Sequence, residues 1–438
     1  MRARVGVGIL NYNGAKHTVR CLDHLEKLDW PAELLQIVVV DNASTDDSVE
    51  VIRRAYPEAE LVLSSRNRGF AGGCNLAIES MGDVDYVALL NNDAMVEPGW
   101  LQPLVRALHD RSDVGAVCSK VLFAARYVDI RLESPTFEPM GLDTRKRGVR
   151  LNAVGIGKRK NQDGCFFPSG FYAAELGSGP PGCRWTDGDA VLRVPVDPEG
   201  DAVCRLEVSA ETTKQLVVSF GDRAKTFTVG KLASRIALDL SGVEGMDMVN
   251  NVGSELVDSK NAADRGIFEI DTGQFEDQQE VFAWCGCSVL FSPRYLQDVG
   301  VFDERFFLYY EDFDLSWRGQ RRGWRYLYEP ASVVRHVHAA TTGESSELFN
   351  FYVWRNRLLV LVKNAPVSVA WGEATGFVVH VFRWLRPELQ RRELSETSRT
   401  LVQVLASFAL NAPAVFADRI RIGVRNRRSP LTRGPAVK

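Results

Sequence analysis

The stretch that most constrains the fold of this chain is 86–97, where four apolar residues, Val87 to Leu90, run into the polar triplet Asn91-Asn92-Asp93. An apolar run without alternation is typical of a strand buried on both faces, as in a parallel sheet covered by helices. Ligands of such sheets bind beyond the carboxyl ends of the strands. A carboxylate there suits a divalent cation holding a phosphorylated substrate, but Asn and Asp are also common turn residues. The triplet alone fits a ligand site and a plain turn equally well.

Similar apolar runs alternate with helical spacing through the first 123 residues. They predict strands at 5–10, 35–40, 61–63, 87–90 and 115–122. The alternation indicates right-handed βαβ units and an α/β fold with a mainly parallel sheet flanked by helices. Asn11, Asp41 and Asn91 then lie at the carboxyl ends of three strands, where their side chains can converge on one ligand.

A glycine-rich turn, 67–75, follows the third predicted strand and opens a helix. Backbone N–H groups at a helix N-terminus suit a diphosphate. The turn is not the dinucleotide-binding fingerprint after a first strand, which disfavours a nicotinamide dehydrogenase. Ser44 and Asp47 have the spacing of a capping box, so a helix-capping turn is the alternative role for Asp41.

Four motifs stand in order in this half: ILNYNG, VVVDNASTD, NRGFAGGCN and LLNNDA. Together they resemble the donor-binding half of a family 2 glycosyltransferase of the GT-A fold, especially its bacterial rhamnosyltransferase-like members. The resemblance implies a nucleotide-sugar site in which Asn11 and Asp41 face the base and ribose. Other residues implied to border the donor are Asn42, Arg68, Gly69, Gly72, Asn75, Asn91 and Asn92. The triplet takes the place of the family's Asp-x-Asp signature, which leaves Asp93 as its only carboxylate for Mg²⁺ or Mn²⁺.

A second cluster, FDERFFLYYEDFDLSWR at 302–318, surrounds a Glu-Asp pair with aromatic residues. Desolvation there would raise a carboxylate pKa, as a general base requires, although capping of the following helix is the alternative. The cluster resembles the family's Glu-Asp signature, which implies that Asp312 is the base and that Glu311 orients the acceptor or supports the loop. A predicted strand ends in His336, which by the same resemblance completes the metal shell or contacts the diphosphate, with His338 as second choice.

Another predicted buried strand, 281–291, carries the small residues Cys285, Gly286 and Cys287, where a ligand could approach closely. Before it, the βαβ pattern stops after Leu122. Short alternating runs in 124–241 predict a small inserted all-β sandwich. Its residues Phe166, Phe167, Tyr172 and Trp185 fit either a carbohydrate-binding platform or, preferably, the core of the insert.

The C-terminal region is predicted to be helical and is strongly basic, with fifteen Lys/Arg and five Asp/Glu between Val353 and Lys438. Apolar patches alternate there with Arg383, Arg386, Arg391, Arg392, Arg419, Arg421, Arg425, Arg427 and Arg428. Such helices suit an anionic membrane surface. A helical pair packed on the catalytic domain, with a solvated basic face, fits equally well. Residues 429–438 are expected to be disordered.

The whole chain has 438 residues and a formal net charge of −3, and no nucleic-acid recognition motif accompanies the basic region. Eight scattered cysteines lack paired Cys-x-x-Cys spacing, so structural zinc is not expected and buried cytosolic thiols are. Cys165 and Cys183 flank a loop and could pair only in an oxidising compartment. No signal peptide or long apolar stretch is visible, which predicts a soluble or peripheral protein on the cytoplasmic side.

These observations predict a donor half at 1–123, an insert at 124–241, an acceptor half at 242–346 and a helical region at 347–438. The expected activity is inverting transfer of a sugar from a dTDP- or UDP-sugar, with rhamnose favoured, to a hydroxyl of a glycan or polyprenyl-diphosphate-linked acceptor. A non-catalytic nucleotide-sugar or glycan-binding protein is the first alternative. A nucleotidyltransferase is the second, although ILNYNGAKH lacks the basic glycine-rich loop usual in that class.

Overall fold

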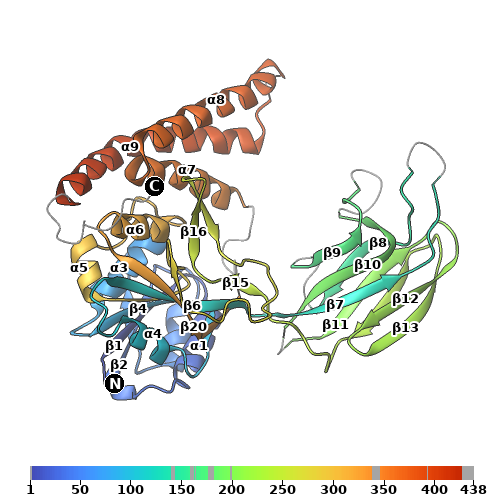
Figure 1. Ribbon diagram of the computed structural model, residues 1–438, viewed down its shortest axis with the longest axis horizontal. Helices are drawn as coiled ribbons and strands as arrows, with labels where there is room; N and C mark the ends of the chain where they lie inside the picture. The colour runs from blue at the N-terminus through green and yellow to red at the C-terminus, as the bar shows by residue number, and fades with distance from the viewer. Residues whose placement is uncertain are drawn as a thin grey trace. The chain divides into compact units, whose positions relative to one another are not determined.

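The computed structural model describes residues 2–139, 144–157, 162, 164–175, 182–197, 200–337, 346–391 and 393–426. The chain divides into two compact units (Figure 1). Unit 1 comprises Met1–Leu122 and Val249–Lys438, and unit 2 comprises Phe123–Met248. Residues 242–248 therefore belong to the inserted unit rather than to the acceptor half. They stay with it because Tyr127 and Met246 exchange backbone hydrogen bonds of 2.8 and 2.7 Å.

Unit 1 is built on a ten-stranded sheet whose main path runs β18-β20-β6-β19-β4-β1-β2-β3. The parallel part consists of β1 (Val5–Asn11), β2 (Leu35–Asp41), β3 (Glu60–Leu63) and β4 (Tyr86–Asn91). The other strands are β5 (Ala94–Val96), β6 (Val114–Phe123), β15 (Val249–Asn251), β18 (Gln279–Val281), β19 (Ser288–Phe291) and β20 (Arg325–His336). The pairs β4–β19, β19–β6, β6–β15, β20–β18 and β20–β5 are antiparallel. The α/β class is confirmed, but the sheet is mixed rather than mainly parallel, because parallel pairing is confined to the first four strands.

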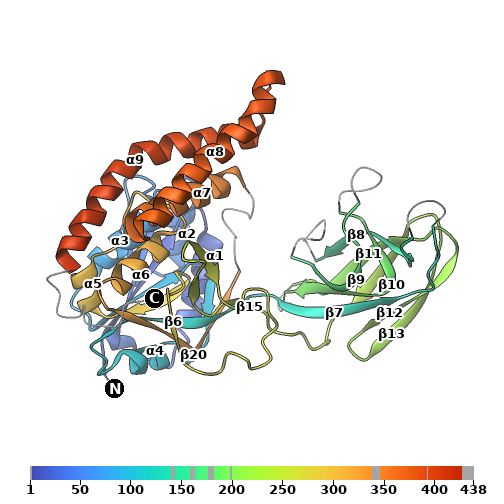
Figure 2. The same ribbon diagram turned by 45° about the horizontal axis from the view of Figure 1, so that its top comes forward.

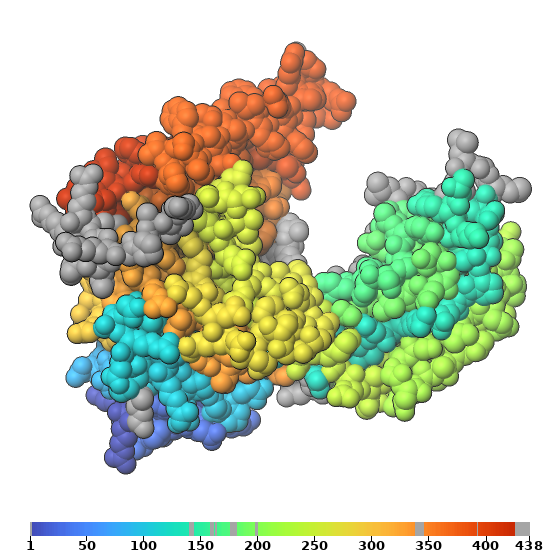
Figure 3. Space-filling model, viewed as in Figure 1, coloured from blue at the N-terminus to red at the C-terminus, as the bar shows by residue number. Residues whose placement is uncertain are grey.

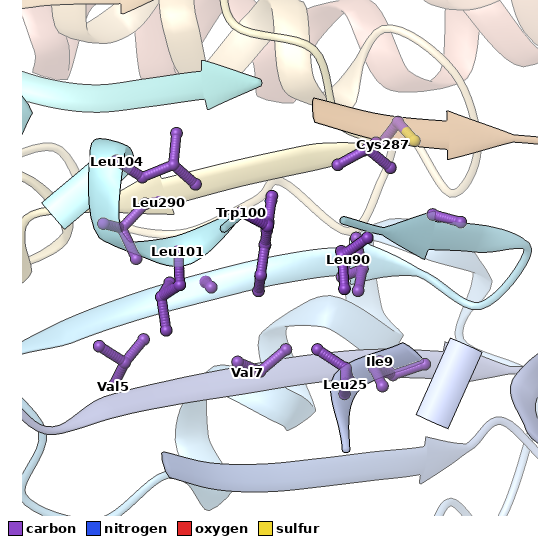
Figure 4. Packing of buried hydrophobic residues seen from close by; sticks show 14 of the residues in the cluster. Val5, Val7, Ile9, Leu25, Leu90, Trp100, Leu101, Leu104, Cys287 and Leu290 are labelled. Atoms are coloured by element: carbon purple, nitrogen blue, oxygen red, sulfur yellow. The ribbon is translucent and has the colours of Figure 1, made fainter. Parts of the chain in front are cut away.

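Helices cover both faces of this sheet. Buried side chains of α1 (Ala15–Leu25), α2 (Ser48–Ala55) and α4 (Leu101–Leu108) share one core with Val5, Val7 and Ile9 of β1 (Figure 4). Those of α3 (Gly69–Ser80), α5 (Pro293–Val299) and α6 (Glu311–Gln320) form the other core. In β4, Ala88 and Leu90 face the first core while Val87 and Leu89 face the second, which explains the unalternating apolar run.

Unit 2 is one eight-stranded antiparallel sheet around its own core, in the order β13-β12-β7-β10-β8-β11-β14 with β9 paired to β10. Its strands are β7 (Arg126–Glu133), β8 (Arg150–Ile156), β9 (Phe166–Phe171), β10 (Arg184–Val196), β11 (Val203–Ser209), β12 (Lys214–Phe220), β13 (Arg223–Val229) and β14 (Ser234–Asp239). The inserted all-β unit is thus confirmed. The sequence reading missed β7, β8 and β9.

The C-terminal helices are α7 (Glu347–Asn364), α8 (Val367–Arg391) and α9 (Glu396–Asn426). Figures 1 and 2 show α8 and α9 as a hairpin beside α7. Leu359 and Leu361 of α7 share a buried cluster with Phe313 of α6 and Val415 of α9. The predicted helical region is confirmed as far as Asn426. Arg392, Arg427, Arg428 and 429–438 lie outside the described residues.

Within the part of the chain that is described, one helical stretch, Glu396–Val424, is long and apolar enough to cross a membrane, with a mean hydropathy of 1.6, so the expectation of no long apolar stretch is wrong. All eight cysteines are free thiols, including Cys165 and Cys183.

Candidate active site

Asn11 and Asp41 end the neighbouring strands β1 and β2 and lie opposite each other in the parallel register. Asn11 Nδ2 donates to Asp41 Oδ1 over 2.9 Å, and both side chains are buried. Ser44 completes the cluster, because its N–H donates to Asp41 Oδ2 at 3.0 Å and its hydroxyl to Oδ1 at 2.6 Å. The predicted capping box is wrong, since α2 has Asp47 as its N-cap and no side-chain cap bond. Contact of Asn11 and Asp41 with a nucleotide stays a prediction.

Asn42 fixes the glycine-rich turn from the neighbouring loop. Its Oδ1 accepts the N–H of Arg68 at 2.9 Å, and its Nδ2 donates to the carbonyl oxygen of Gly69 at 3.0 Å. The N–H of Gly69 donates to Asn67 Oδ1 at 2.8 Å. The first N–H groups of the turn therefore have partners within the chain.

The glycines of this turn allow close packing against the segment that precedes α6. Gly69 has a φ of +69°, and a Cβ there would lie 2.3 Å from the carbonyl oxygen of Phe307. That oxygen accepts the N–H of Ala71 at 3.2 Å. A Cβ on Gly72 would lie 3.1 Å from Glu304 Oε2. The prediction that the turn offers its N–H groups to a diphosphate is wrong for residues 68, 69 and 71.

Asn75 and Arg68 attach α3 to the same segment. Asn75 Nδ2 donates to the carbonyl oxygen of Phe302 at 2.9 Å, and Asn75 Oδ1 accepts the Phe302 N–H at 3.0 Å. Arg68 Nη2 donates to Glu304 Oε1 at 2.9 Å. Both side chains thus have a structural role, and their contact with the donor stays a prediction.

The polar triplet after β4 connects the Asn11–Asp41 cluster with His336 at the end of β20. Asn92 Nδ2 donates to Thr18 Oγ1 at 3.1 Å, and that hydroxyl donates to Asn11 Oδ1 at 2.7 Å. Asn91 Nδ2 lies 3.3 Å from His336 Nε2. Asn91 Oδ1 is buried and has no hydrogen-bond partner among the described residues. Such an orphaned acceptor points to a ligand at this place.

Asp93 and His336 meet where β20 pairs with β5, because His336 lies opposite Ala94. His336 Nε2 is 3.0 Å from Asp93 Oδ1, and both side chains are buried. On its other side, His336 Nδ1 is 2.9 Å from Asn250 Oδ1. An Nδ1–H donated to Asn250 leaves the Nε2 lone pair free to accept from Asn91 Nδ2 or to bind a cation shared with the Asp93 carboxylate. His338 lies outside the described residues.

The donors around Asp93 fit a divalent cation. Burial raises the Asp93 pKa, but the nearby His336 and His17 outweigh burial, and the net pKa is below its ordinary value. The carboxylate is therefore ionised, as a metal ligand must be. Burial and the Asp93 charge raise the pKa of the Cys21 thiol, and burial with the neighbouring Cys285 and Asp93 raises that of Cys287.

Together with Asn91 Oδ1, this pair leaves coordination positions for diphosphate oxygens and water, the usual arrangement for Mg²⁺ with phosphorylated substrates. Among the described residues no cluster of three or more His, Cys, Asp and Glu could hold a metal by itself.

Asp312 and Glu311 form the first turn of α6. The Asp312 carboxylate accepts the N–H of Phe313 at 2.7 Å and that of Gly286 at 3.3 Å. Burial, aided by the charge of Asp264, raises the Asp312 pKa to about 6 against the opposing effect of these donors. Burial and Asp312 raise the Glu311 pKa well above its ordinary value. Glu311 is therefore neutral while Asp312 ionises near neutral pH, as a general base requires.

The predicted strand at 281–291 is interrupted, and the interruption places Gly286 beside Asp312. Strands β18 and β19 leave residues 282–287 outside regular pairing. A Cβ on Gly286 would lie 3.1 Å from Asp312 Oδ2, so the small residue admits the Asp312 side chain. The N–H of Asn91 donates to the carbonyl oxygen of Cys287 at 2.9 Å. This backbone therefore links the Asp93 end of β4 to Asp312.

The loop before α6 has an unusual backbone. Its left-handed residues are Phe307 (φ 64°), Tyr309 (φ 66°) and Tyr310 (φ 68°). Each such non-glycine residue costs on the order of 1–3 kcal/mol, so the loop must be held by its surroundings.

Helix α7 holds it through two buried polar residues. Asn356 Nδ2 lies 2.8, 2.7 and 2.7 Å from the carbonyl oxygens of Phe306, Leu308 and Tyr309. Arg355 Nη2 donates to the carbonyl oxygens of Arg305 and Phe306 at 2.7 and 2.8 Å. The backbone that leads into Glu311 and Asp312 is thus clamped by α7.

Sequence reasoning missed Asn250, Asp264 and Asn356. Asn251 Nδ2 donates to Asp264 Oδ1 at 2.7 Å, so the adjacent residues 250 and 251 orient both His336 and Asp264. The available signal was a pair of asparagines in an apolar strand and a single asparagine in the apolar helix 347–364, since buried polar residues need a partner.

In unit 2, the aromatic side chains considered as a carbohydrate-binding platform mainly pack against other residues of the unit. Trp185 is only 6% exposed, its Nε1 donates to Glu175 Oε1 at 3.0 Å, and its ring lies edge-on to Phe137. Phe167 lies edge-on to Phe171 beside the core of the unit. The preferred core role of these aromatics is the one that their burial supports.

The model of glycosyl transferase family 2 matches residues 7–159, about a third of the chain. A 101-residue stretch is 30% identical to the glycosyltransferase AglE of Haloferax volcanii and covers 22% of this chain and 33% of that protein. A 71-residue stretch is 38% identical to an N-acetylglucosaminyl-diphospho-decaprenol L-rhamnosyltransferase of Mycobacterium tuberculosis and covers 16% of this chain and 23% of that protein. The chain thus matches only about a third or less of the length of these relatives.

Among solved structures, GalNAc-T7 with UDP, GalNAc and Mn²⁺ aligns with 98% of this chain and 58% of its own, at 12% identity and a TM-score of 0.44. The mannosyltransferase PcManGT of Pyrobaculum calidifontis aligns at 15% identity and a TM-score of 0.39, over 98% of this chain and 88% of its own. The sequence similarity to glycosyl transferase family 2, at residues 7–159, includes the stretch that carries the predicted donor motifs.

Proposed function

We propose that the protein is an inverting glycosyltransferase that moves a sugar from a nucleoside-diphosphate donor to a hydroxyl of a glycan or lipid-linked glycan. The observation that carries the proposal is the Asp93–His336 pair, with the raised-pKa carboxyl of Asp312 linked to the same sheet edge. A metal ligand set beside a base matched to neutral pH is what transfer from a diphosphate donor needs.

In the proposed donor site, Asn11, Asp41 and Asn42 face the nucleotide at the ends of β1 and β2. Arg68, Gly69, Gly72 and Asn75 border it indirectly, by fixing the segment 302–310 against α3. Asp93 and His336, with Asn91 and Asn92 beside them, would hold Mg²⁺ or Mn²⁺. When bound, the cation would neutralise charge on the leaving nucleoside diphosphate.

In the proposed reaction, ionised Asp312 accepts the proton of the acceptor hydroxyl. At the same time the hydroxyl oxygen bonds to the anomeric carbon of the donor sugar. The bond from that carbon to the diphosphate oxygen breaks on the opposite side, which inverts the configuration. Neutral Glu311 adds no negative charge beside the base and can donate a hydrogen bond to the acceptor. One displacement needs no carboxylate nucleophile.

Rhamnose from a dTDP donor is our preferred substrate, with UDP-galactose or UDP-N-acetylglucosamine next. The motif resemblance and the 38% identical stretch shared with an L-rhamnosyltransferase support this choice. A polyprenyl-diphosphate-linked acceptor would place the reaction on the cytoplasmic side of the plasma membrane, in cell-envelope polysaccharide synthesis.

A non-catalytic nucleotide-sugar or glycan-binding protein is the alternative. It would need no base, whereas the buried Glu311 Oε2, which has no hydrogen-bond partner among the described residues, and the strained loop before α6 are features often found at reaction sites.

The test compares Asp312→Asn with wild type on the sugar donor that most raises the melting temperature in the presence of Mn²⁺. Asp312→Asn is expected to keep donor binding and to lose release of nucleoside diphosphate by about a hundredfold or more. Asp110→Asn, at an exposed position, is the matched control. Activity of Asp312→Asn within a few-fold of wild type would refute the assignment of the base. Donor binding without product from the wild type, across a panel of glycan acceptors, would favour the alternative.

A further inference from the structure

Helices α8 and α9 carry large apolar side chains on faces that pack against nothing in the described chain. We define the α8–α9 face by these exposed apolar residues: Trp371, Val379, Phe382 and Leu389 on α8, and Val402, Leu410, Phe416, Ile420 and Val424 on α9. Trp371, Phe382 and Leu410 are 72%, 67% and 81% exposed. In the space-filling view the side chains of α8, in orange, form the outer surface at the top (Figure 3). Exposed apolar area this extended marks an interaction site.

The exposed residues follow helical periodicity. On α8, Trp371, Phe382 and Leu389 stand at i, i+11 and i+18, which is one side of a helix. On α9, Val402, Phe416 and Ile420 also share one side. These residues form a stripe on each helix, whereas Trp384, at i+13 from Trp371, lies on another side of α8.

The opposite side of α9 is fixed within unit 1. Val404 and Val415 are fully buried there. Arg419 Nη1 donates to the carbonyl oxygens of Val362 and Ala365 at 2.9 and 2.6 Å, and Asp418 pairs with Arg305. A helix that is apolar on both sides is expected inside a core or a lipid phase. While these contacts with unit 1 hold, α9 can lie in a lipid surface with its exposed side but cannot be surrounded by lipid.

The charges on this face are cationic. The exposed charged residues of the two helices are Arg383, Arg386, Arg391, Arg399, Arg421 and, at the first residue of α9, Glu396. The other acidic residues have partners: Glu373 pairs with Lys260 and Arg357, and Glu388 accepts hydrogen bonds from Ser395 and Ser398. Glu393, between the two helices, is also exposed, so five exposed arginines stand against two exposed glutamates and arginine is in excess.

The arginine excess distinguishes two possible partners of this face, a second copy of the chain and a lipid surface. Two copies joined by a two-fold axis through this face would bring arginines against arginines, which repel. Anionic lipid headgroups attract the arginines, while Trp371 suits the boundary between headgroups and acyl chains. We infer that the α8–α9 face is a lipid-binding surface that seats unit 1 in the plane of an anionic bilayer. The inference needs no transferase activity.

The experiment is sedimentation of the full chain with vesicles, in the absence of donor and acceptor. Wild type is expected to pellet with vesicles of equal parts phosphatidylcholine and phosphatidylglycerol, and less with phosphatidylcholine alone. The variant W371Q/F382Q/L410Q/F416Q is expected to lose about tenfold or more of the partition coefficient, because four apolar groups no longer enter the lipid. Leu232→Gln, at an 88% exposed leucine of unit 2, is the matched control and should bind like wild type.

Two further measurements keep the test decisive. The single variant Phe382→Gln, at an exposed position, is expected to weaken binding even if the fourfold variant misfolds, and circular dichroism reports folding of each. R383Q/R386Q should reduce the preference for phosphatidylglycerol and the sensitivity of binding to salt. Failure of wild type to pellet with the mixed vesicles, or equal binding by folded Phe382→Gln, would overturn the inference. A wild-type dimer in light scattering that the apolar substitutions convert to a monomer would overturn it in favour of self-association.

Discussion

The ring of His336 lies between two side chains, with Nε2 3.0 Å from Asp93 Oδ1 and Nδ1 2.9 Å from Asn250 Oδ1. Asn250 fixes the orientation of the ring and the position of its proton. Asn250→Ala is therefore expected to weaken Mn²⁺ binding by about tenfold to a hundredfold while leaving the fold intact. Electron paramagnetic resonance of protein-bound Mn²⁺ measures this, and Asp93→Ala should lower the affinity further. Asn152→Ala, at a buried asparagine of unit 2, is the control. Unchanged affinity in both Asn250→Ala and Asp93→Ala would remove the metal assignment.

The Asp312 pKa of about 6 predicts how activity depends on pH. The base must be ionised, so kcat/KM should rise as pH increases through about 6 and then level off. The pH–rate profile of wild type checks this. A profile that is flat between pH 5 and 8 would contradict the role of Asp312.

The raised pKa of Asp312 also predicts that replacing this residue by asparagine increases the stability of the folded protein. Because the folded-state pKa of Asp312 is raised, its ionisation destabilises the folded protein as pH rises above its unfolded-state value. Asp312→Asn should be more stable than wild type at pH 7 by about 1–3 kcal/mol, and the difference should vanish near pH 4. Urea unfolding at the two pH values measures it. An Asp312→Asn protein less stable than wild type at pH 7 would show that the folded protein favours the ionised carboxylate, contrary to a raised pKa.

Asn356 is expected to position the base from a distance. Asn356→Ala removes the donor that holds three carbonyl oxygens of the strained loop, so kcat should fall about tenfold or more with little change in donor affinity. A loosened loop also admits water to Asp312, which should move the inflection of the pH–rate profile downward. Asn411→Ala, at a half-buried asparagine that bonds only Ser407 of its own helix in the described contacts, is the control. Loss of stability without a shift of the pH profile would indicate a purely structural role.

The packing of α3 on the loop predicts the effect of Gly69→Ala. A Cβ at this left-handed residue would lie 2.3 Å from the Phe307 carbonyl oxygen, so the loop must move or the fold must strain. The free energy of unfolding should fall by more than about 1 kcal/mol, and turnover should fall with it. A Cβ on Gly99 meets nothing within 4 Å, so Gly99→Ala should change neither. Equal behaviour of the two variants would argue against the close contact.

The strand ends of the donor half could be predicted because apolar runs and the turns after them are local patterns, as at Val87–Asp93. The antiparallel position of β19 between β4 and β6 could not, since a strand buried on both faces reads alike whether its neighbours are parallel or antiparallel. The approach of Asn250 to His336 and of Asn356 to the 306–310 loop depends on tertiary packing between segments far apart in sequence. The spacing of Ser44 and Asp47 wrongly predicted a capping box, because the Ser44 hydroxyl donates its hydrogen bond to Asp41 instead. The strands β7, β8 and β9 were hidden among the Gly, Pro and Asp residues of 124–182.

The chain leaves unit 1 at Leu122 and returns at Val249, and these two residues are antiparallel partners. Excision of residues 123–248 would therefore leave two ends already at hairpin distance, which a short turn such as Asn-Gly could join. Because both attachment points lie side by side in one strand pair, the insert can change in length or be removed without altering the register of the sheet in unit 1. A chain shortened in this way is expected to fold with the unit 1 core intact.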